Sequence, residues 1–326
     1  MKSHPIFRTL VASAMLMMAG APTSAQEFPN RPVRIIVPAP AGGIFDIVAR
    51  VIADKVSIDW GKPIIVETRV GADGNIGIDA AAKAAPDGHT WLITGPALLV
   101  NPLIYGNLPW NGLRDFQGVG VPMVGQNIAV VSSSVPVKTL KEFAAYAAAR
   151  PGQLNFGNSS TGASPHLSAE LFFQVTGIKL TPINYKGQPP LIPDMLSGQV
   201  HFSILSLGLA LPHIKSGKLT PLAMFTPQRA VALPDVPTVS EAGYPAASLV
   251  PAFVLYVPSA TPKDIVARIN SGINKAIGSP EVQSRLQAAG GLPGMEKTPE
   301  QIQAMVKQDA EVLSKIVRDA GIKPTN

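Results

Sequence analysis

The stretch VPAPAGGIFDIVAR (residues 37–50) holds the strongest indication of how this chain folds and what it binds. The apolar run VRIIV (33–37) is typical of a buried strand, and IVARVIADKV (47–56) repeats its apolar residues with helical spacing. Between them lies a proline-broken loop that ends in Gly42-Gly43. Such a loop exposes backbone N–H groups at the start of a helix, where they attract anions. The sequence therefore predicts an anion-binding strand–loop–helix unit.

The first 25 residues have the features of an export signal. Lys2 and Arg8 form a basic segment, LVASAMLMMAG (10–20) is a short apolar run, and TSA (23–25) resembles a signal-peptide cleavage site. An apolar run of this length is too short to cross a bilayer as a helix. We therefore expect residues 1–25 to be a removed signal peptide and the mature protein to be periplasmic.

Composition excludes several classes of protein. The 326 residues include no cysteine, so a disulfide scaffold, a thiolate nucleophile and a cysteine-bound metal are all excluded. The formal net charge is +6, and without Lys2 and Arg8 it falls to +4, with 25 basic residues against 21 acidic ones. These charges are spread along the chain without a basic helix, so we expect no nucleic-acid partner. A mild positive bias suits an anionic small ligand.

Segments typical of strands and helices alternate along the chain, which predicts an α/β fold with parallel sheets. Strands are expected at 33–37, 63–68, 89–95, 128–134, 153–158, 179–185, 199–205, within 212–225 and at 253–258. Helices are expected at 47–56, 76–85, 139–150, 166–177, 189–198, 262–277, 280–289 and 298–320. The strand–loop–helix unit recurs in the second half, with the small-residue loop SSTGASP (159–165) before its helix. Two such halves suggest two domains facing a cleft at the carboxyl ends of their strands, where α/β sheets bind ligands.

The sequence contains no motif with recognisable catalytic chemistry. The five histidines form no H-E-x-x-H pair, and there is no G-x-S-x-G nucleophile turn. Neither GK (61–62) nor GK (217–218) is followed by the Ser or Thr of a phosphate-binding loop, and GVGVPM (118–123) lacks the third glycine of a dinucleotide-binding pattern. We therefore expect neither an enzyme nor a cofactor or metal site.

Two loops remain as candidate anion sites. The candidate residues of the first loop are Ala39, Ala41, Gly42, Gly43, Ile44, Phe45 and Asp46. Asp46 also suits a structural role as a helix-start carboxylate paired with Arg50. The candidates of the second loop are Asn158, Ser159, Ser160, Thr161, Gly162, Ala163, Ser164 and His166. The alternative there is a Ser/Thr-rich helix cap and nothing more, and His166 suits a structural capping contact better than ligation.

Further candidates follow the later strands. Tyr185 and Lys186 add a phenol and a cation at a strand end, although a lone lysine in a loop is usually solvated.

Two helix N-termini facing one cleft suit a ligand with two negative groups, because neutral N–H donors hold carboxylates while leaving the binding reversible. Reversible binding without a reaction is therefore the simplest interpretation.

Seven blocks of the sequence together resemble the substrate-binding proteins of tripartite tricarboxylate transporters, the Bug or TctC family. In order from about residue 28 to 322, they are PNRPVRIIVPAPAGGIFDIVAR, GADGNIGIDAAAKAAPDGHTWLI, RPGQLNFGNSSTGASPHLSAELF, INYKG, LSGQVHFSI, LPHIKSGKLTPLA and ALPDVPTVSEAGYP. The resemblance implies a type II periplasmic-binding-protein fold, with two α/β domains and a ligand cleft between them. We expect 26–125 plus 250–326 to form domain 1 and 126–249 to form domain 2.

The resemblance also implies a function. It implies a receptor that binds a carboxylate and delivers it to membrane permease subunits, one large and one small. It implies ligand contacts from the two loops, which match residues 39–46 and 158–164 here. We expect a monomer without a cofactor.

Departures from the family pattern bear on the ligand. Relatives commonly carry small residues such as Gly-Thr at Ile44-Phe45, and Asp-Asn after the strand that ends here at Leu205-Ser206. Phe45 adds a flat apolar wall, and the absence of a carboxylate at Leu205 removes a partner for an ammonium or hydroxyl group. The candidate site is completed by Gly95, Pro96, Leu205 and Ser206.

The expected ligand is therefore an aromatic or aliphatic dicarboxylate with an apolar body, such as a phthalate isomer (terephthalate among them) or adipate. One alternative is an ordinary C4–C6 acid, with Phe45 packed in the hinge. Another is a receptor that hands its liganded form to a signalling protein, because the same cleft would serve that role.

Overall fold

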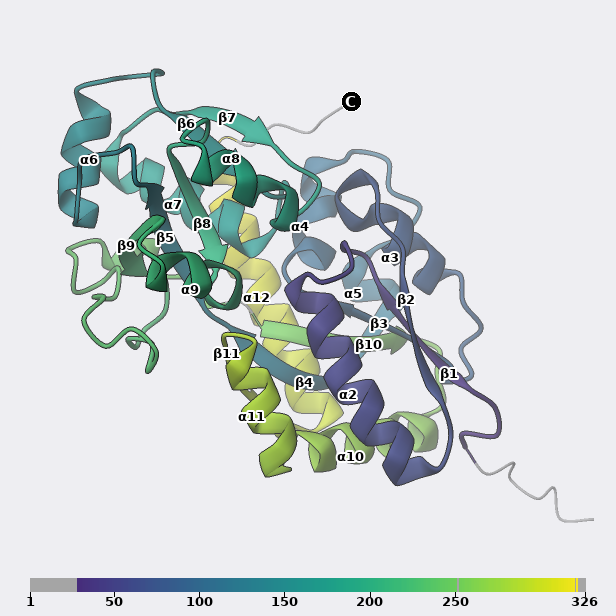
Figure 1. Cartoon of the computed structure of the whole chain (residues 1–326). Helices are drawn as coiled ribbons and strands as arrows, with labels where there is room; N and C mark the ends of the chain where they lie inside the picture. Colours follow the sequence, from purple (N-terminus) through teal and green to yellow (C-terminus); the bar gives the residue numbers. More distant parts are fainter. Residues whose placement is uncertain (1–27, 251, 320, 322–326) are drawn as a thin grey trace, which may run out of the picture.

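The computed structural model describes residues 28–250, 252–319 and 321, and its chain builds two β-sheets, each covered by helices (Figure 1). We call the six-stranded sheet with its helices the first lobe, and the five-stranded sheet with its helices the second lobe. The expected signal peptide, residues 1–25, lies outside the described residues. No helix in the described part of the chain is long and apolar enough to cross a membrane.

The sheet of the first lobe has the strand order β11-β4-β10-β3-β1-β2. Its strands are β1 (Val33–Val37), β2 (Ile64–Thr68), β3 (Thr90–Thr94), β4 (Phe116–Gly125), β10 (Ala252–Pro258) and β11 (Gly291–Met295). β1 pairs in parallel with β2 and β3, whereas β10 is antiparallel to both β3 and β4, and β11 is antiparallel to β4. The expected parallel pairing is therefore present at β1, β2 and β3, but the sheet as a whole is mixed, because β10 and β11 pair antiparallel. Two of the antiparallel strands, β10 and β11, belong to the C-terminal part of the chain, and the third, β4, is the glycine-rich segment 116–125.

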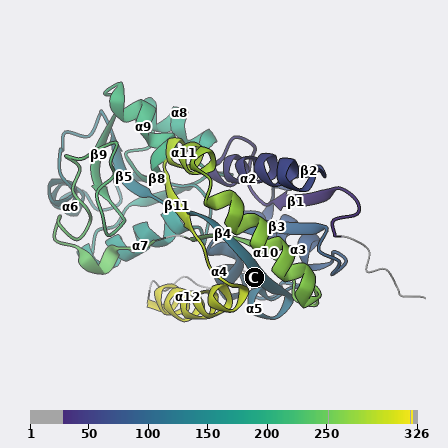
Figure 2. The same ribbon diagram turned by 90° about the horizontal axis from the view of Figure 1, so that it is seen from below.

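Helices cover both faces of this sheet. They are α2 (Ile44–Trp60), α3 (Asn75–Ala82), α4 (Ala97–Ile104), α5 (Gly112–Asp115), α10 (Lys263–Ile277), α11 (Pro280–Ala288) and α12 (Pro299–Asp319), with the short η1 (Ala72–Gly74). On one face α2, α10 and α11 share a core with β1 and β3, and on the other α3, α4 and α12 share a second core. Figure 2 shows α2 and α12 on opposite sides of the sheet.

The sheet of the second lobe has the order β7-β6-β8-β5-β9. Its elements are β5 (Asn127–Ser132), α6 (Leu140–Ala148), β6 (Asn155–Asn158), α7 (Ser164–Thr176), β7 (Thr181–Asn184), η2 (Pro189–Leu191), α8 (Ile192–Leu196), β8 (Phe202–Ser206), α9 (Leu207–Lys215), β9 (Leu219–Met224) and η3 (Pro245–Ala247). β6 is parallel to β7 and β8, and β5 is antiparallel to β8 and β9. α6 and α7 pack on one face, and α8 and α9 on the other.

The two lobes are joined in three places. The chain crosses once between β4 and β5, which only Gln126 separates, and returns through the long connection between β9 and β10. The third junction is a buried apolar cluster that combines α4 and α12 of the first lobe with α7 of the second. The cluster consists of Val100, Ile104, Leu167, Leu313, Ile316 and Val317. The α12 helix therefore packs against both lobes.

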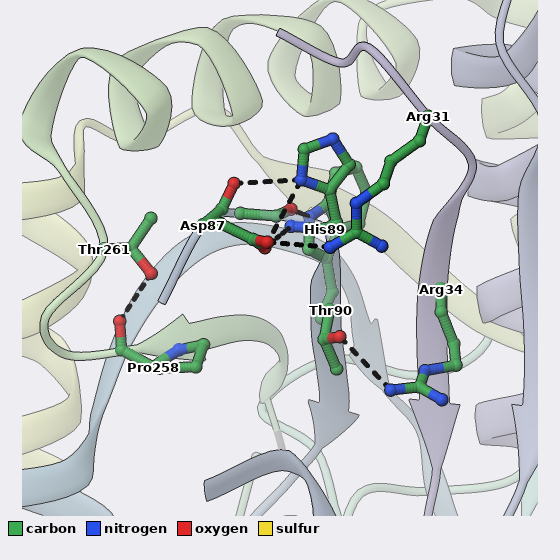
Figure 3. Close-up of polar contacts among 9 residues, drawn as sticks. Arg31, Arg34, Asp87, His89, Thr90, Pro258 and Thr261 are labelled. Carbon is green, nitrogen blue, oxygen red and sulfur yellow. Dashed lines mark hydrogen bonds and ion pairs between the residues drawn. The ribbon is translucent and has the colours of Figure 1, made fainter. Parts of the chain in front are cut away.

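A polar cluster fixes the start of the described chain at the amino end of β3 (Figure 3). Arg31 donates to Asp87 at 2.7 Å, and His89 Nδ1 lies 3.3 Å from the same carboxylate. Burial alone would raise the pKa of Asp87, but hydrogen bonds from the His89 N–H and the Arg31 guanidinium, together with their positive charges, keep that pKa below its usual value. Arg34 reaches the Thr90 hydroxyl beside this cluster. All these residues lie at the end of β3 opposite its carboxyl end at Thr94, so His89 has a structural role there.

Candidate ligand-binding site

A cavity of about 690 Å³ lies between the two lobes. In the first lobe its walls are the loops that follow β1, β2 and β3, and in the second lobe the loops that follow β6, β7 and β8. These six strands belong to the parallel parts of the two sheets, so the carboxyl ends of both sets face one space. Crevices at the carboxyl ends of parallel strands are where open α/β sheets bind ligands. Phe253 of β10 and Gln126, the residue at which the chain passes from the first lobe to the second, complete the wall between the lobes.

The first loop brings the N-terminus of α2 to this cavity. Gly43, in extended geometry, precedes the helix, and no described side chain caps the helix N-terminus. The N–H groups of Ile44 and Phe45 have no protein acceptor among the described residues. Uncapped N–H groups at a helix start carry a partial positive charge, which suits an anion. The α2 N-terminus is therefore open to a ligand.

Asp46 stabilises this loop from a position outside the cavity wall. Its side chain is only 5% exposed, and its Oδ2 accepts the N–H of Gly42 at 3.0 Å. Arg50, one turn further along α2, approaches the same carboxylate at 3.0 Å, and this hydrogen bond raises the pKa of Arg50. Gly42 itself has a φ of +75°, a conformation that glycine adopts without strain. Of the two roles considered for Asp46, the structure supports the structural one.

The second loop brings the N-terminus of α7 to the opposite wall. Ala163 precedes this helix in extended geometry, again without a side-chain cap among the described residues. The hydroxyls of the loop are used elsewhere: Ser164 Oγ accepts from Asn127 Nδ2, and Ser160 Oγ donates to Asp73 Oδ1 at 3.0 Å. The alternative of a simple Ser/Thr helix cap is therefore wrong. The N–H of Ser164 has no protein acceptor in the described part of the chain.

His166 stabilises the second loop and does not reach the cavity. Its Nδ1 accepts the N–H of Gly162 at 3.2 Å, and its Nε2 lies 3.5 Å from Glu170. Burial lowers the pKa of His166 to about 4, against a smaller opposing effect of the Asp73 carboxylate. The neutral ring is the form that can accept at Nδ1. The expectation of a structural contact in the first turn therefore fits this geometry.

The loop after β7 supplies polar groups with defined partners. The Tyr185 hydroxyl donates to Asp194, and burial together with this hydrogen bond raises the pKa of Tyr185 to about 12. Gln188 Oε1 accepts both the N–H of Ser206 at 3.0 Å and its hydroxyl at 2.7 Å. Lys186 lines the cavity and is otherwise exposed.

An aromatic pair forms the apolar wall. Phe45, at the start of α2, stacks on Phe253 of β10 with ring centroids 4.4 Å apart and an interplanar angle of 28°. Both rings line the cavity. A side-chain carbon at Gly95 would lie 3.3 Å from the Phe45 ring, so the turn after β3 closes over it. Phe45 therefore lines the cavity and also contacts the strand that returns from the second lobe.

The structure brings most of the expected site residues to the cavity wall. Those that line it are Ala39, Ala41, Gly43, Ile44, Phe45, Gly95, Pro96, Ser159, Ser160, Ala163, Ser164, Tyr185 and Ser206. Those that lie away from it are Gly42, Asp46, Asn158, Thr161, Gly162, His166 and Leu205.

The residues away from the wall have other partners. Asn158 donates to Asn184, and its own oxygen accepts the N–H of Ser160. A side-chain carbon at Gly162 would lie 3.0 Å from Val100, so this residue packs on α4. Leu205 is fully buried in the core of the second lobe, because neighbouring residues of a strand point to opposite faces and Ser206 takes the cavity side.

Sequence reasoning missed many residues of the wall, among them Asp73, Gln126, Gln188 and Phe253. Asp73 stands in the turn-rich segment 70–75, and a carboxylate in a loop after a parallel strand was a signal that could have found it. The other three gave no local signal, because only the tertiary arrangement brings them to the cavity. Among the described residues, no group of three His, Cys, Asp or Glu side chains is placed to hold a metal ion.

Comparisons with known proteins agree with this geometry. The model of the tripartite tricarboxylate transporter family receptor matches residues 48–322. Protein BugT of Bordetella pertussis is 36% identical over 307 residues, covering 93% of each chain. The structure of R. palustris Rpa4515 with adipate is 33% identical, with a TM-score of 0.87, and covers 92% of this chain and all of that one. MatC of Rhodopseudomonas palustris, with bound malate, is 28% identical with a TM-score of 0.82, over 89% of this chain and all of that one.

Proposed function

The chain belongs to the tripartite tricarboxylate transporter receptor family, and from that premise we propose that it captures an organic acid between its lobes and releases it unaltered. One observation carries the proposal: the uncapped N-termini of α2 and α7 line the same interlobe cavity. Neutral N–H donors hold a carboxylate without fixing it permanently. A receptor that releases its ligand to a transporter needs binding that is specific but reversible.

The ligand proposed is a carboxylate with an apolar body, such as adipate or a phthalate isomer. The stacked Phe45 and Phe253 rings support it, because burying apolar surface against them favours a ring or methylene chain. The structures with adipate and with malate belong to relatives, and both of those ligands are dicarboxylates. Malate, a C4 acid that carries a hydroxyl group, makes the ordinary C4–C6 acids without an extended apolar body the second candidate class. The proposed contacts are the wall residues of the loops after β1, β3, β6, β7 and β8 named above.

The proposal extends to location and partners. We place the mature protein in the periplasm as a monomer, with 26–125 plus 250–326 and 126–249 as the two domains that close on the acid. Its partners are the large and small permease subunits of a tripartite transporter, since the family is that transporter's receptor. Co-purification of those subunits with the tagged, acid-loaded protein would support this role, and co-purification of a sensor protein alone would favour signalling.

A thermal-shift screen tests the binding. A ligand that binds only the native state raises the midpoint of unfolding by mass action. We expect terephthalate, phthalate, adipate or malate to raise it, and the matched diamides, which lack a carboxylate, to leave it unchanged. Calorimetry then ranks the acids, and recovery of the intact acid after incubation tests the absence of turnover. Binding of citrate or glutamate alone would contradict the proposed apolar ligand, and loss of the acid would contradict a pure receptor.

A further inference from the structure

The cavity wall carries one carboxylate, that of Asp73, among the described residues that line it. The single cation of this wall is Lys186, on the other lobe and exposed. A carboxylate in a cavity that presents helix N-termini to an acid is unexpected, because like charges repel. Asp73 therefore needs a role that is compatible with an anionic ligand.

The backbone around Asp73 is held in a costly conformation. Ala72 and Asp73 have φ values of 47° and 51°, in the left-handed region that non-glycine residues rarely adopt. Asn101 of α4 donates to the carbonyl oxygen of Asp73 at 3.1 Å, and the Tyr105 hydroxyl donates to its Oδ2. Strained residues persist only where surrounding contacts hold them, and they cluster at ligand sites. The first lobe thus fixes the Asp73 side chain at the wall.

The charge of Asp73 is hydrogen-bonded but not neutralised. Its Oδ1 accepts from Ser160 Oγ of the second lobe at 3.0 Å, so both of its partners are neutral hydroxyls. No Lys, Arg or His of the described chain forms an ion pair with it. Each carboxylate oxygen can accept a second hydrogen bond. The Asp73 carboxylate is therefore a negatively charged group in the cavity wall that can accept further hydrogen bonds.

We propose that Asp73 is a specificity-determining residue that favours acids with one negative charge and a hydrogen-bond donor over dianions of the same size. A donor such as a hydroxyl, amide or ammonium group satisfies the free acceptor positions of Asp73. A second carboxylate in the cavity instead meets an uncompensated like charge, which is an element that selects against a competing ligand. The inference rests on the proposed function and narrows its ligand class: acids with the same apolar body but one carboxylate and a hydrogen-bond donor are expected to bind more tightly than the diacids named there.

Asp73 also replaces the carboxylate that the chain lacks at Leu205. The absence of a carboxylate at Leu205 argued against ligands that carry an ammonium or hydroxyl group. The structure supplies such a carboxylate from the first lobe, at Asp73, so these ligands regain a partner.

Calorimetry with length-matched pairs tests this inference. The pairs are adipate with its monoamide, and terephthalate with 4-carbamoylbenzoate, each measured against the wild type and Asp73→Asn at one pH. We expect the wild type to bind each monoamide about tenfold tighter than the diacid, and Asp73→Asn to lower that ratio about tenfold by improving the diacid. Asp264→Asn removes the same charge at the exposed start of α10, outside the cavity wall, and should leave the ratio unchanged.

Two results would overturn the inference alone. One is a wild type that prefers the diacids, and the other is an Asp73→Asn protein in which both members of a pair change equally, as for a structural residue. If Asp73→Asn does not fold, Asp73→Gly is measured in its place, because glycine adopts the left-handed conformation without strain. Failure of every acid to bind the wild type would overturn the proposed function and this inference together. An unchanged ratio with retained binding overturns the inference alone.

Discussion

At the scale of single residues, the polar side chains near the cavity mostly hold the loops in place. Asp46 fixes the loop before α2, His166 fixes the loop before α7, and Gln188 joins the loop after β7 to Ser206. The first backbone N–H groups of α2 and α7 are left without a side-chain cap at the cavity wall. Binding specificity therefore depends on loop positions as much as on the residues that line the wall.

His166 should make stability depend on pH. Its folded pKa of about 4 lies below the usual value near 6.5, so between these limits the unfolded chain binds a proton that the folded chain does not. Stability is therefore lost as the pH falls through this window, by about 2 kcal/mol between pH 7 and pH 5. Urea unfolding at the two pH values should show this loss in the wild type and not in His166→Gln.

His213, in the last turn of α9, provides the matched control for His166. His213→Gln should keep the pH dependence of the wild type. Equal pH dependence in His166→Gln and the wild type would contradict the role assigned to the buried ring.

Phe45→Ala should weaken the binding of acids with an apolar body. The substitution removes the ring that stacks on Phe253, and losing that contact should lower the affinity for terephthalate or adipate about tenfold. Malate, which offers little apolar surface, should lose much less. Calorimetry with the three acids measures the difference. An equal loss for all three would mean that Phe45 acts only through the hinge.

At the scale of elements, two helices without side-chain caps begin at one cavity. A helix start without a cap normally costs stability, since its first N–H groups need partners. The first residues of α2 and α7 line the cavity. A ligand bound there would supply the hydrogen-bond acceptors that side-chain caps supply in other helices. The strand–loop–helix pattern of the sequence predicted both positions.

Ile44→Pro tests the helix N-terminus directly. Proline is tolerated at the first position of a helix, where its missing N–H costs no intrahelical bond. The substitution should lower the affinity for an acid about tenfold or more, as expected for a lost hydrogen bond to a charged group, with little change in the unfolding midpoint. Ile44→Ala keeps the N–H and should bind more nearly as the wild type does. Similar affinities for the two variants would mean that this N–H does not contact the acid.

Prediction from sequence succeeded where local patterns determine the element. The strand at 33–37 is confirmed, and the helix at 139–150 has the capping box of Thr139 and Glu142 that the sequence indicates. The strand at 116–125 was missed, because its glycines and proline are typical of a loop and only pairing with β10 and β11 makes it a strand. Gln126, Gln188 and Phe253 were missed for a similar reason, since only the tertiary arrangement brings them to the cavity wall.

At the scale of the whole molecule, the lobes touch at several points around the cavity. Ser160 of the second lobe reaches Asp73 of the first, and Gly187 faces Pro40 so closely that a side-chain carbon at Gly187 would lie 2.8 Å from its ring. Gly208 meets the backbone of Ala289 at a similar junction. The structure is therefore a closed arrangement of the lobes. Closure of the lobes on a ligand, as proposed above, would require these contacts to separate on opening while the two chain crossings between the lobes stay intact.

Gly187→Ala should hinder closure without unfolding either lobe. The added methyl group meets Pro40 across the lobes, and the φ of +107° at this position adds backbone strain. Gly152→Ala is the matched control, because it also has a positive φ, +71°, but nothing within 4 Å of the added carbon. Both variants should lose some stability, about 1 kcal/mol from backbone strain, whereas only Gly187→Ala should bind acids more weakly. Small-angle scattering at saturating acid should show the wild type and Gly152→Ala compacting fully and Gly187→Ala remaining more extended. Equal compaction and equal affinity in the two variants would show that closure does not pass through the contact between Gly187 and Pro40.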